Sequence, residues 1–424
     1  MHINRLLIQN FRGFESLELR LNPKFTVAIG DNGKGKSSLL HALQVSLGAY
    51  LQCLPIPASA VYRRQFKPQE RFVKWNSNER DYFPNQTDTL IQAWAYFDDT
   101  NPAITWTRRM LKSGVTSHSG SLAGELIFAV THLLFQREKH HDEILPVVAS
   151  FGTERTVAQQ RKGKKAQQRR SRMEKGYLAA LSNKVDFDGV LEWLHNYDSE
   201  LKYNKEFEGT RDAVFNAITT AIPYLEDVAY NNRYQELEAA VTIDEHSLGR
   251  MTHSNMSDGL IAMLNMVAEL AFRCVILNGF LGTDAVRKTT GVVLIDELDM
   301  HLHPNWQRHV VADLKRAFPN IQFIVTTHSA FIVQSLESDE LYNLDKPTDI
   351  PPKDLKIDEV ATAVMGVPSP FSDENTNTYN DVKSMLLKFQ QHGLTPELKD
   401  EINNIADPAL RAFLELNIHS KEKK

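Results

Sequence analysis

Short hydrophobic runs and polar turns alternate along the first fifty residues. Hydrophobic side chains dominate residues 3–11, 17–21 and 25–29, and runs of this length between polar turns predict strands. A glycine-rich turn follows. Residues 37–51 then carry leucine, alanine and valine at the three- and four-residue spacing of a helix with one broad buried side. The chain is therefore predicted to open with three strands, a loop and a helix.

Three later segments, residues 144–152, 291–295 and 321–325, are almost wholly apolar. Such runs lack the alternation of a half-exposed strand and are typical of parallel strands that are buried on both faces. Strands of this kind that alternate with helices predict an α/β fold, in which helices cover both faces of a parallel sheet. The helices are expected near residues 122–135, 176–222, 257–274 and 304–318.

Composition narrows the class of protein. With 424 residues, of which 42% are hydrophobic, the chain is long enough for two or three domains. Its 48 Lys and Arg residues against 53 Asp and Glu residues give a formal net charge of −5, which excludes a surface that is positive throughout. Two cysteines are too few for a disulfide framework or a thiolate metal cluster. The N-terminal residues lack the apolar core of a signal peptide, so we expect a cytoplasmic protein without a membrane span.

One segment departs sharply from this charge balance. Residues 161–175 hold eight lysines and arginines and a single glutamate. Mobile cations at this density neutralise phosphate groups in nucleic-acid complexes, and a solvated loop has the same composition. Two interpretations of residues 161–175 therefore stay open, a contact with DNA, RNA or an acidic partner and an exposed loop.

The glycine-rich turn reads Gly30-Asp-Asn-Gly-Lys-Gly-Lys-Ser37 and satisfies the pattern G-x-x-x-x-G-K-[ST]. In this pattern, main-chain amides surround phosphate oxygens, the lysine neutralises them and the hydroxyl binds Mg²⁺. The turn therefore predicts a nucleotide site, in which Lys36 also serves catalysis and Ser37 also binds the metal. The expected nucleotide-binding residues are Asn32, Gly33, Lys34, Gly35, Lys36, Ser37 and Ser38.

Two predicted strands end in polar residues. Residues 291–295 lead directly into Asp296 and Glu297, and residues 321–325 lead to His328. The carboxyl ends of parallel strands meet at the sheet edge where α/β proteins bind ligands. We expect Asp296 to hold Mg²⁺ and Glu297 to polarise the attacking water. His328 is expected to contact the γ-phosphate.

A second phosphate site is predicted at residues 256–260, Met-Ser-Asp-Gly-Leu, where a helix begins. Ser257 supplies a hydroxyl, and Gly259 lies among the free amides of the helix N-terminus. Since residues 30–37 already serve the phosphates within one chain, two such sites imply two chains. We therefore expect a homodimer or a higher homo-oligomer that sandwiches the nucleotide between subunits.

Together with Asn10-Phe-Arg-Gly-Phe14, these motifs resemble the ABC-type ATPase heads of the SMC, RecF and OLD group. The resemblance covers residues 1–50 and 250–345 strongly. It implies that the cofactors are ATP and Mg²⁺, and that the signature of one subunit closes over the ATP held by the other. Asp258 stands where transporter ATPases usually have glycine, which argues against a transporter.

Two longer stretches, residues 146–155 and 295–304, resemble the compact PtuA-type ATPases of the Septu antiphage systems. That resemblance implies an oligomeric, ATP-controlled sensor and scaffold that recruits an HNH nuclease of the PtuB type. This sequence shows neither an HNH signature nor room after residue 345 for a TOPRIM nuclease domain, so we expect nuclease activity only in the partner. The alternatives are a RecF-like DNA repair ATPase and, with less support, an OLD-type nuclease.

The resemblance also has consequences for the metal site and for the domains. ABC heads contact the metal with a glutamine, for which Gln92 and Gln136 are both candidates. We expect an N-terminal part of the ATPase head at residues 1–150, a helical insertion at 151–225, the C-terminal part of the head at 226–345 and a helical region at 346–424.

Overall fold

A computed structural model of the chain divides into two compact units, Met1–Ile357 and Asp358–Lys424. The first unit contains the glycine-rich turn and the segments around Ser257, Asp296 and His328. The structure describes residues 1–59, 61–77, 80–85, 87–97, 102–117, 120–140, 142–155, 170–243, 245–346, 350–369, 384–385, 388–389, 393–405, 411 and 414.

A five-stranded parallel sheet lies at the centre of the first unit, in the order β15-β3-β14-β13-β9. Every residue of β3, β9, β13 and β14 is buried, as their apolar sequences predict. The α/β class is therefore confirmed. The edge strand β15 is only three partly exposed residues long, so it has no recognisable sequence pattern. The strands are β3 (Phe25–Ile29), β9 (Val147–Phe151), β13 (Gly291–Ile295), β14 (Ile321–Thr326) and β15 (Leu341–Asn343).

A second five-stranded sheet is antiparallel, in the order β2-β1-β6-β7-β8. The helix α1 (Lys36–Cys53) contacts β1, β6 and β7 of this sheet and β14 of the parallel sheet. Because α1 lies between two sheets, it is buried on nearly every side. The antiparallel strands are β1 (His2–Phe11), β2 (Phe14–Arg20), β6 (Thr89–Tyr96), β7 (Ile104–Met110) and β8 (Thr116–Ser117), and a separate hairpin pairs β4 (Val73–Asn76) with β5 (Asp81–Pro84).

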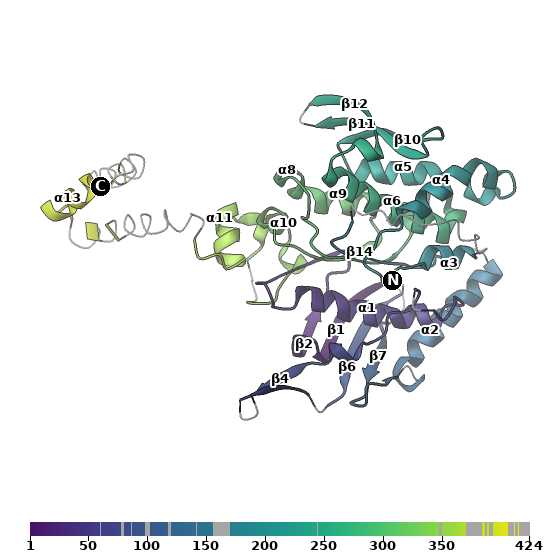
Figure 1. Cartoon of the computed structure of the whole chain (residues 1–424), viewed down its shortest axis with the longest axis horizontal. Coiled ribbons are helices and arrows are strands. Elements are labelled where there is room, and N and C mark those ends of the chain that lie inside the picture. The colour runs from purple at the N-terminus through teal and green to yellow at the C-terminus, as the bar shows by residue number, and fades with distance from the viewer. Residues whose placement is uncertain are drawn as a thin grey trace. The chain divides into compact units, whose positions relative to one another are not determined.

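A third sheet and a group of helices complete the first unit. In Figure 1, β14 lies between the sheet of β1, β2, β6 and β7 and the sheet of β10, β11 and β12. The third sheet consists of β10 (Leu225–Asn231), β11 (Glu236–Ile243) and β12 (His246–Thr252). The helices are α2 (Gly120–His140), α3 (Arg172–Tyr177), α4 (Phe187–Leu201), α5 (Thr210–Ala221), α6 (Asp258–Asn278), α7 (Ala285–Lys288), α8 (Pro304–Gln307), α9 (Val310–Ala317) and α10 (Ala330–Gln334).

Two predicted helices are interrupted. The helix expected at residues 304–318 is α8 and α9, because His309 has φ −126° and leaves the helical conformation. The helical stretch expected at residues 176–222 is α3, α4 and α5, and α5 begins after Gly209, whose φ of 79° is left-handed. In each case the apolar spacing predicted the buried face but not the break.

The helix α6 forms much of the core. Helices α3, α4 and α5 all pack against it. Residues Asp258–Lys288 are long and apolar enough, by length and composition, to cross a membrane, but 94% of the most apolar window is buried inside the fold. This hydrophobicity is accounted for by packing against the neighbouring helices.

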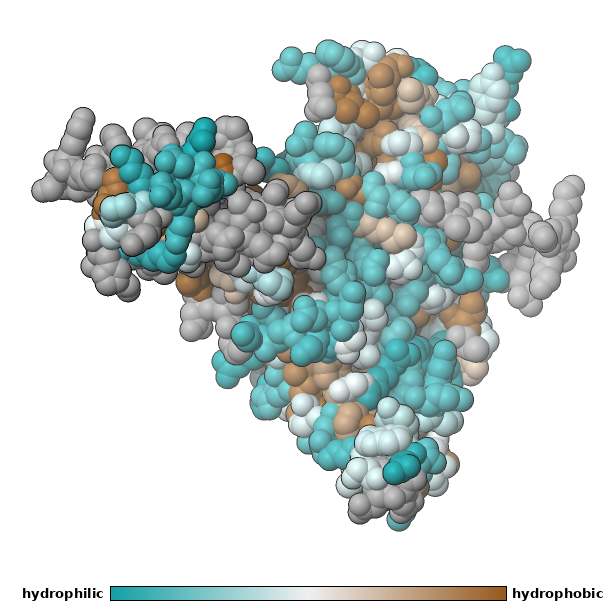
Figure 2. All heavy atoms as spheres, turned by 60° about the vertical axis from the view of Figure 1, so that its left-hand side comes forward, coloured by the Kyte–Doolittle hydropathy of each residue, from teal (hydrophilic) through white to brown (hydrophobic). Residues whose placement is uncertain are grey.

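Hydrophobic side chains are also exposed on part of the surface. Figure 2 shows them gathered at the upper end of that view, over the three-stranded sheet. Ile243 of β11 and Leu248 of β12 are exposed hydrophobic residues of this sheet.

The described residues of the second unit include a π-helical turn at Val360–Val364 and the helix α13 (Pro396–Asn403). The short helix α11 (Ile357–Glu359) begins with the last residue of the first unit. Thr395 begins α13, because its side chain accepts a hydrogen bond from the amide of Leu398 at 3.2 Å. A small core surrounds α13. Its members are Leu398, Ile402 and Leu414, with Met385, Phe389 and Ile405 packed against them.

Candidate nucleotide site

The glycine-rich turn joins β3 to α1, with strand before and helix after as its pattern requires. Gly33 and Gly35 have φ of 86° and 99°, a region that favours glycine. A Cβ on Gly35 would lie 2.6 Å from Cζ of Phe14. Phe14 therefore packs directly against the turn, and the left-handed φ together with this close approach favours glycine at position 35.

Lys36 is buried within the turn, with 8% of its surface exposed. Its ammonium donates hydrogen bonds to the carbonyl oxygens of Gly30 at 2.6 Å and Asp31 at 3.2 Å. Burial lowers the pKa of Lys36, and the neighbouring carboxylates of Asp345 and Asp31 oppose that shift. The helix that Lys36 begins has no side-chain N-cap and no acidic residue in its first turn. Its free amides and positive dipole end therefore suit a phosphate group.

Ser37 and Asp296 meet across the sheet edge. Ser37 Oγ donates to Asp296 Oδ2 at 3.0 Å, although the two residues are distant in the sequence. A hydroxyl and a carboxylate are hard oxygen donors of the kind that Mg²⁺ prefers. The donor set therefore fits the predicted metal site.

Thr326, which our sequence analysis missed, contacts both acidic residues, through the carboxylate of Asp296 and the main-chain amide of Glu297. Its hydroxyl donates to Asp296 Oδ1 at 2.6 Å and accepts from the amide of Glu297 at 2.8 Å. The contact follows from strand order and register, because β14 lies beside β13 and Ile295 pairs with Val325. Once the register is known, the next residue on each strand brings Thr326 beside Asp296.

Glu297 has an unusual main-chain conformation, with φ of +51°. This conformation costs a residue other than glycine about 1–3 kcal/mol, and it persists only where the surroundings fix it. Here its amide is held by Thr326, and its carbonyl oxygen accepts a hydrogen bond from the guanidinium of Arg155. The carboxylate thus projects from a turn that is fixed on both sides.

His328 follows β14 and is exposed. Its amide and the hydroxyl of Thr327 both donate to Asp299 Oδ1, at 3.2 Å and 2.5 Å. The Asp299 carboxylate therefore joins the loop after Glu297 to the end of β14 within one chain. Thr327 is a second polar residue at this edge that the sequence analysis did not single out.

Ser257 precedes α6 and is exposed, and its side chain makes no capping hydrogen bond. Gly259, in the first turn, lies against the loop after Glu297, because a Cβ there would be 2.4 Å from the carbonyl oxygen of His301. Among the hydrogen bonds of the described residues, none joins Ser257 to residues 30–38. The structure thus brings together Lys36, Ser37, Asp296 and Glu297 but does not add Ser257 to them.

The remaining predicted residues lie around the turn. Asn32 is exposed and Ser38 is half-buried in α1. Lys34 Nζ pairs with Asp345 Oδ1 at 2.9 Å, and Asp345 Oδ2 accepts from the amide of Asp31 at 2.7 Å. These bonds from Lys34 and the Asp31 amide lower the pKa of Asp345. Asp345 follows β15, so the edge strand that the sequence analysis missed also supplies a contact to the turn.

Neither candidate glutamine bonds to this site in the described part of the chain. Gln92 lies in β6 of the antiparallel sheet. The amide of Gln136, in α2, contacts His132 Nε2 at 3.1 Å. The choice between Gln92 and Gln136 therefore stays open.

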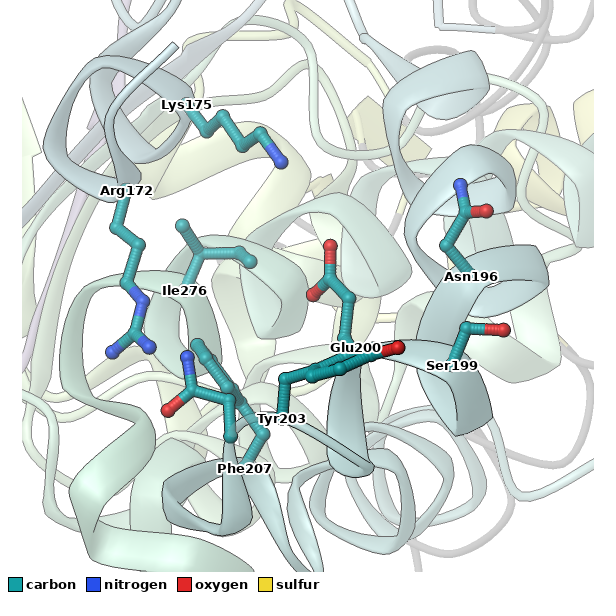
Figure 3. A pocket seen from close by; sticks show the side chains of 9 residues that line it. Arg172, Lys175, Asn196, Ser199, Glu200, Tyr203, Phe207 and Ile276 are labelled. Carbon is teal, nitrogen blue, oxygen red and sulfur yellow. The ribbon is translucent and has the colours of Figure 1, made fainter. Parts of the chain in front are cut away.

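Most of the basic segment, residues 161–169, lies outside the described residues, so its predicted nucleic-acid contact is untested. Its last part enters α3. There Arg172 pairs with Glu206 at 2.8 Å and stacks over the ring of Phe207 at 4.2 Å. Figure 3 shows Arg172 and Lys175 facing Asn196 and Ser199 of α4 across a pocket of about 510 Å³.

Comparisons with known proteins agree with this architecture. A family model described as an AAA ATPase domain matches residues 1–87. A second, described as "AAA domain, putative AbiEii toxin, Type IV TA system", matches residues 82–334, more than half of the chain. The retron Ec83 probable ATPase of Escherichia coli is 24% identical over 405 residues, which cover 80% of this chain and 70% of that protein.

Two further similarities are more local or more distant. The Septu protein PtuA of Bacillus mycoides (strain KBAB4) is 39% identical over 87 residues, 20% of this chain and 11% of that protein. An SMC head bound to the C-winged helix domain of ScpA has a TM-score of 0.45 and 16% identity, and the match covers 80% of this chain and 93% of that chain. The glycine-rich turn follows a strand of the parallel sheet, and the two AAA domain models together match residues 1–334. The chain belongs to the family of AAA domains described for putative AbiEii toxins, is related to the retron and PtuA ATPases, and is an ATPase.

Proposed function

We propose that two copies of this chain enclose ATP between them. The turn at residues 30–37 of one copy binds the triphosphate, and Ser257 and Gly259 of the other copy close over it. Support comes from the exposure of Ser257 and from the absence of any hydrogen bond, among the described residues, between Ser257 and the turn of its own chain. A helix N-terminus with free amides is suited to the phosphates of a neighbouring subunit.

Within each site, the chain's own groups have separate roles. Ser37 and Asp296 would hold Mg²⁺, which when bound neutralises charge on the β- and γ-phosphates. Lys36 turns from the carbonyl oxygens of Gly30 and Asp31 to the phosphate oxygens. Glu297 accepts a hydrogen bond from the attacking water and polarises it. His328, exposed at the end of β14, contacts the γ-phosphate.

The observation that carries this assignment is the 3.0 Å contact between Ser37 and Asp296, with Thr326 fixing the carboxylate. The test compares Lys36→Ala and Glu297→Gln with the unaltered protein. Lys36→Ala should abolish ATP binding in equilibrium dialysis. Glu297→Gln should bind ATP, lose turnover and accumulate as a dimer in native mass spectrometry. Turnover at the normal rate by the Glu297→Gln protein would contradict the role given to this carboxylate.

The cellular role that we propose is antiphage defence in the cytoplasm, as an oligomeric ATPase that recruits and regulates a partner HNH nuclease. Support comes from the similarity to the Septu protein PtuA and to the retron Ec83 probable ATPase. The test is co-expression with the products of adjacent reading frames, followed by native mass spectrometry with and without ATP. Co-purification of a nuclease supports the role, and its absence under both conditions counts against it.

The basic segment 161–175 is proposed to contact nucleic acid within that complex. Its support is the density of cations in the sequence. Replacement of the eight cations by serine should weaken nucleic-acid binding and flatten its dependence on salt. Unchanged binding with an unchanged salt slope would leave the segment as an exposed loop.

A further inference from the structure

A buried arginine outside the nucleotide-binding motifs contacts the turn that carries both carboxylates. Arg155 follows β9, and 2% of its surface is exposed. Its Nη2 donates to the carbonyl oxygen of Asp296 at 3.2 Å and to the carbonyl oxygen of Glu297. Burial lowers the pKa of Arg155 to about 10, while the carboxylates of Asp299, Asp296 and Glu297 favour its charged form. The guanidinium is thus a buried cation at the main chain of residues 296 and 297, which we call the catalytic turn.

This contact acts on a residue in a strained conformation. Glu297, with φ of +51°, keeps its left-handed conformation only if its peptide groups are fixed. Thr326 holds the amide on one side, and Arg155 holds the carbonyl oxygen on the other. Loss of either contact frees the main chain to relax and changes the direction of the Glu297 carboxylate.

Arg155 also connects this turn to α6. Its own carbonyl oxygen accepts a hydrogen bond from Asn265 Nδ2 at 3.0 Å, and Asn265, fully buried in α6, bonds to His253 Nε2 at 2.7 Å. The first turn of the same helix touches the loop after Glu297 through Gly259. The helix that follows Ser257 is therefore linked to the turn at Asp296 and Glu297 indirectly, through Arg155, and touches the loop after that turn through Gly259.

We propose that Arg155 is a positioning residue for ATP hydrolysis: it directs the Glu297 carboxylate and, through Asn265, couples that carboxylate to the helix that meets the partner subunit's nucleotide. The proposal rests on the function proposed above. It deepens that function because contact of Ser257 with the ATP held by the partner subunit would change the geometry of Glu297 in the nucleotide site of its own chain. Arg155 itself does not touch ATP.

The test replaces Arg155 by methionine, which keeps much of the length and removes the guanidinium. We expect the kcat for ATP to fall about 10- to 100-fold while the Kd for ATP changes less than about threefold, since the loss concerns a group outside the phosphate site. Arg155→Lys should recover part of the kcat. Arg137→Met is the matched control, because Arg137 also donates to main-chain carbonyl oxygens, those of Glu143 at 2.6 Å and Leu277 at 2.5 Å. It should keep kcat within about twofold.

The decisive measurement combines Arg155→Met with Glu297→Gln and follows a single turnover. If Arg155 acts through Glu297, the double variant is no slower than Glu297→Gln alone, because substitutions of residues that act as a unit do not have additive effects on the activation free energy. A multiplicative loss would overturn the proposal, since it would give Arg155 an independent effect. If Arg155→Met does not fold, Asn265→Ala takes its place, with an expected fall in kcat of about 3- to 10-fold and the same absence of additivity.

The same variants distinguish the function proposed for the nucleotide site from the positioning role of Arg155. If Lys36→Ala and Glu297→Gln both hydrolyse ATP at the normal rate, the function proposed for this site fails. If Glu297→Gln loses turnover while Arg155→Met and Asn265→Ala hydrolyse ATP normally, the site stands and only the positioning role of Arg155 fails.

Discussion

Replacement of Thr326 by valine tests how Asp296 and Glu297, the residues proposed above to hold Mg²⁺ and to polarise the attacking water, are held in place. Thr326 is fully buried, and valine has nearly the same shape without the hydroxyl. The change removes the hydrogen bond to Asp296 Oδ1 at 2.6 Å and the one from the amide of Glu297 at 2.8 Å. The Asp296 carboxylate and the main-chain amide of Glu297 each lose a contact, while the hydroxyl of Ser37 stays in place.

The expected loss in the free energy of unfolding follows from these two hydrogen bonds. The bond to the carboxylate contributes about 1.5–3 kcal/mol and the neutral bond about 0.5–1.5 kcal/mol, so the free energy of unfolding should fall by roughly 2–4.5 kcal/mol. The effect on catalysis arises because Asp296 and Glu297 are less well oriented. A tenfold to hundredfold fall in kcat corresponds to about 1.4–2.7 kcal/mol of transition-state stabilisation.

The assays are steady-state ATP hydrolysis over a Mg²⁺ titration and equilibrium unfolding in urea. Thr289→Val is the matched control, because Thr289 is also fully buried and its hydroxyl donates to Ala285 O at 2.6 Å and accepts from Asn278 at 3.0 Å. This control should lose about 1–3 kcal/mol of stability and keep its kcat. A Thr326→Val protein that hydrolyses ATP within twofold of the normal rate, with the same Mg²⁺ dependence, would show that Thr326 does not orient Asp296 and Glu297 for catalysis.

Three further predictions concern packing, pH and a buried ion pair. Gly259→Ala should lower ATP turnover and cost about 1–3 kcal/mol in urea unfolding, because its Cβ would lie 2.4 Å from His301 O. Burial lowers the pKa of His253 below 6.5, so as the pH falls the unfolded chain binds a proton at this residue before the folded chain does. The free energy of unfolding should therefore decrease as the pH is lowered from about 6.5, by at most about 1.4 kcal/mol per pH unit. The variant His253→Gln should reduce this slope. Arg273→Met should cost about 3–5 kcal/mol, because it leaves Glu269 buried without the partner it meets at 2.9 Å.

Each of these predictions has an outcome that contradicts it. Normal turnover by Gly259→Ala would show that α6 moves away from the His301 loop without consequence. Equal stability slopes between pH 5 and 7 for the unaltered protein and His253→Gln would exclude His253 as a titrating group. Arg273→Met is compared with Arg211→Met, which removes an exposed pair with Asp198 at 3.1 Å and should cost at most about 1 kcal/mol. Similar losses in the two arginine variants would contradict the buried-pair argument.

Local patterns predicted the elements that carry the motifs. The apolar runs at residues 25–29, 291–295 and 321–325 correspond to β3, β13 and β14, and the spacing after Ser257 predicted α6. These predictions succeed because strands that are buried on both faces and helices with a buried face impose a period on the sequence. Strands without such a period were missed, among them β12, most of whose residues are exposed, and the short edge strand β15.

The sequence alone determined that a strand, a phosphate-binding turn and a helix follow one another, because a glycine-rich turn and its lysine are local features. It also predicted that Asp296, Glu297 and His328 end buried strands. Only the tertiary structure decided that β14 lies between β3 and β13, that Thr326 consequently bonds to Asp296, and that Arg155 holds Glu297. Strand order, register and the contacts of buried side chains depend on residues distant in the chain, and no local period records them.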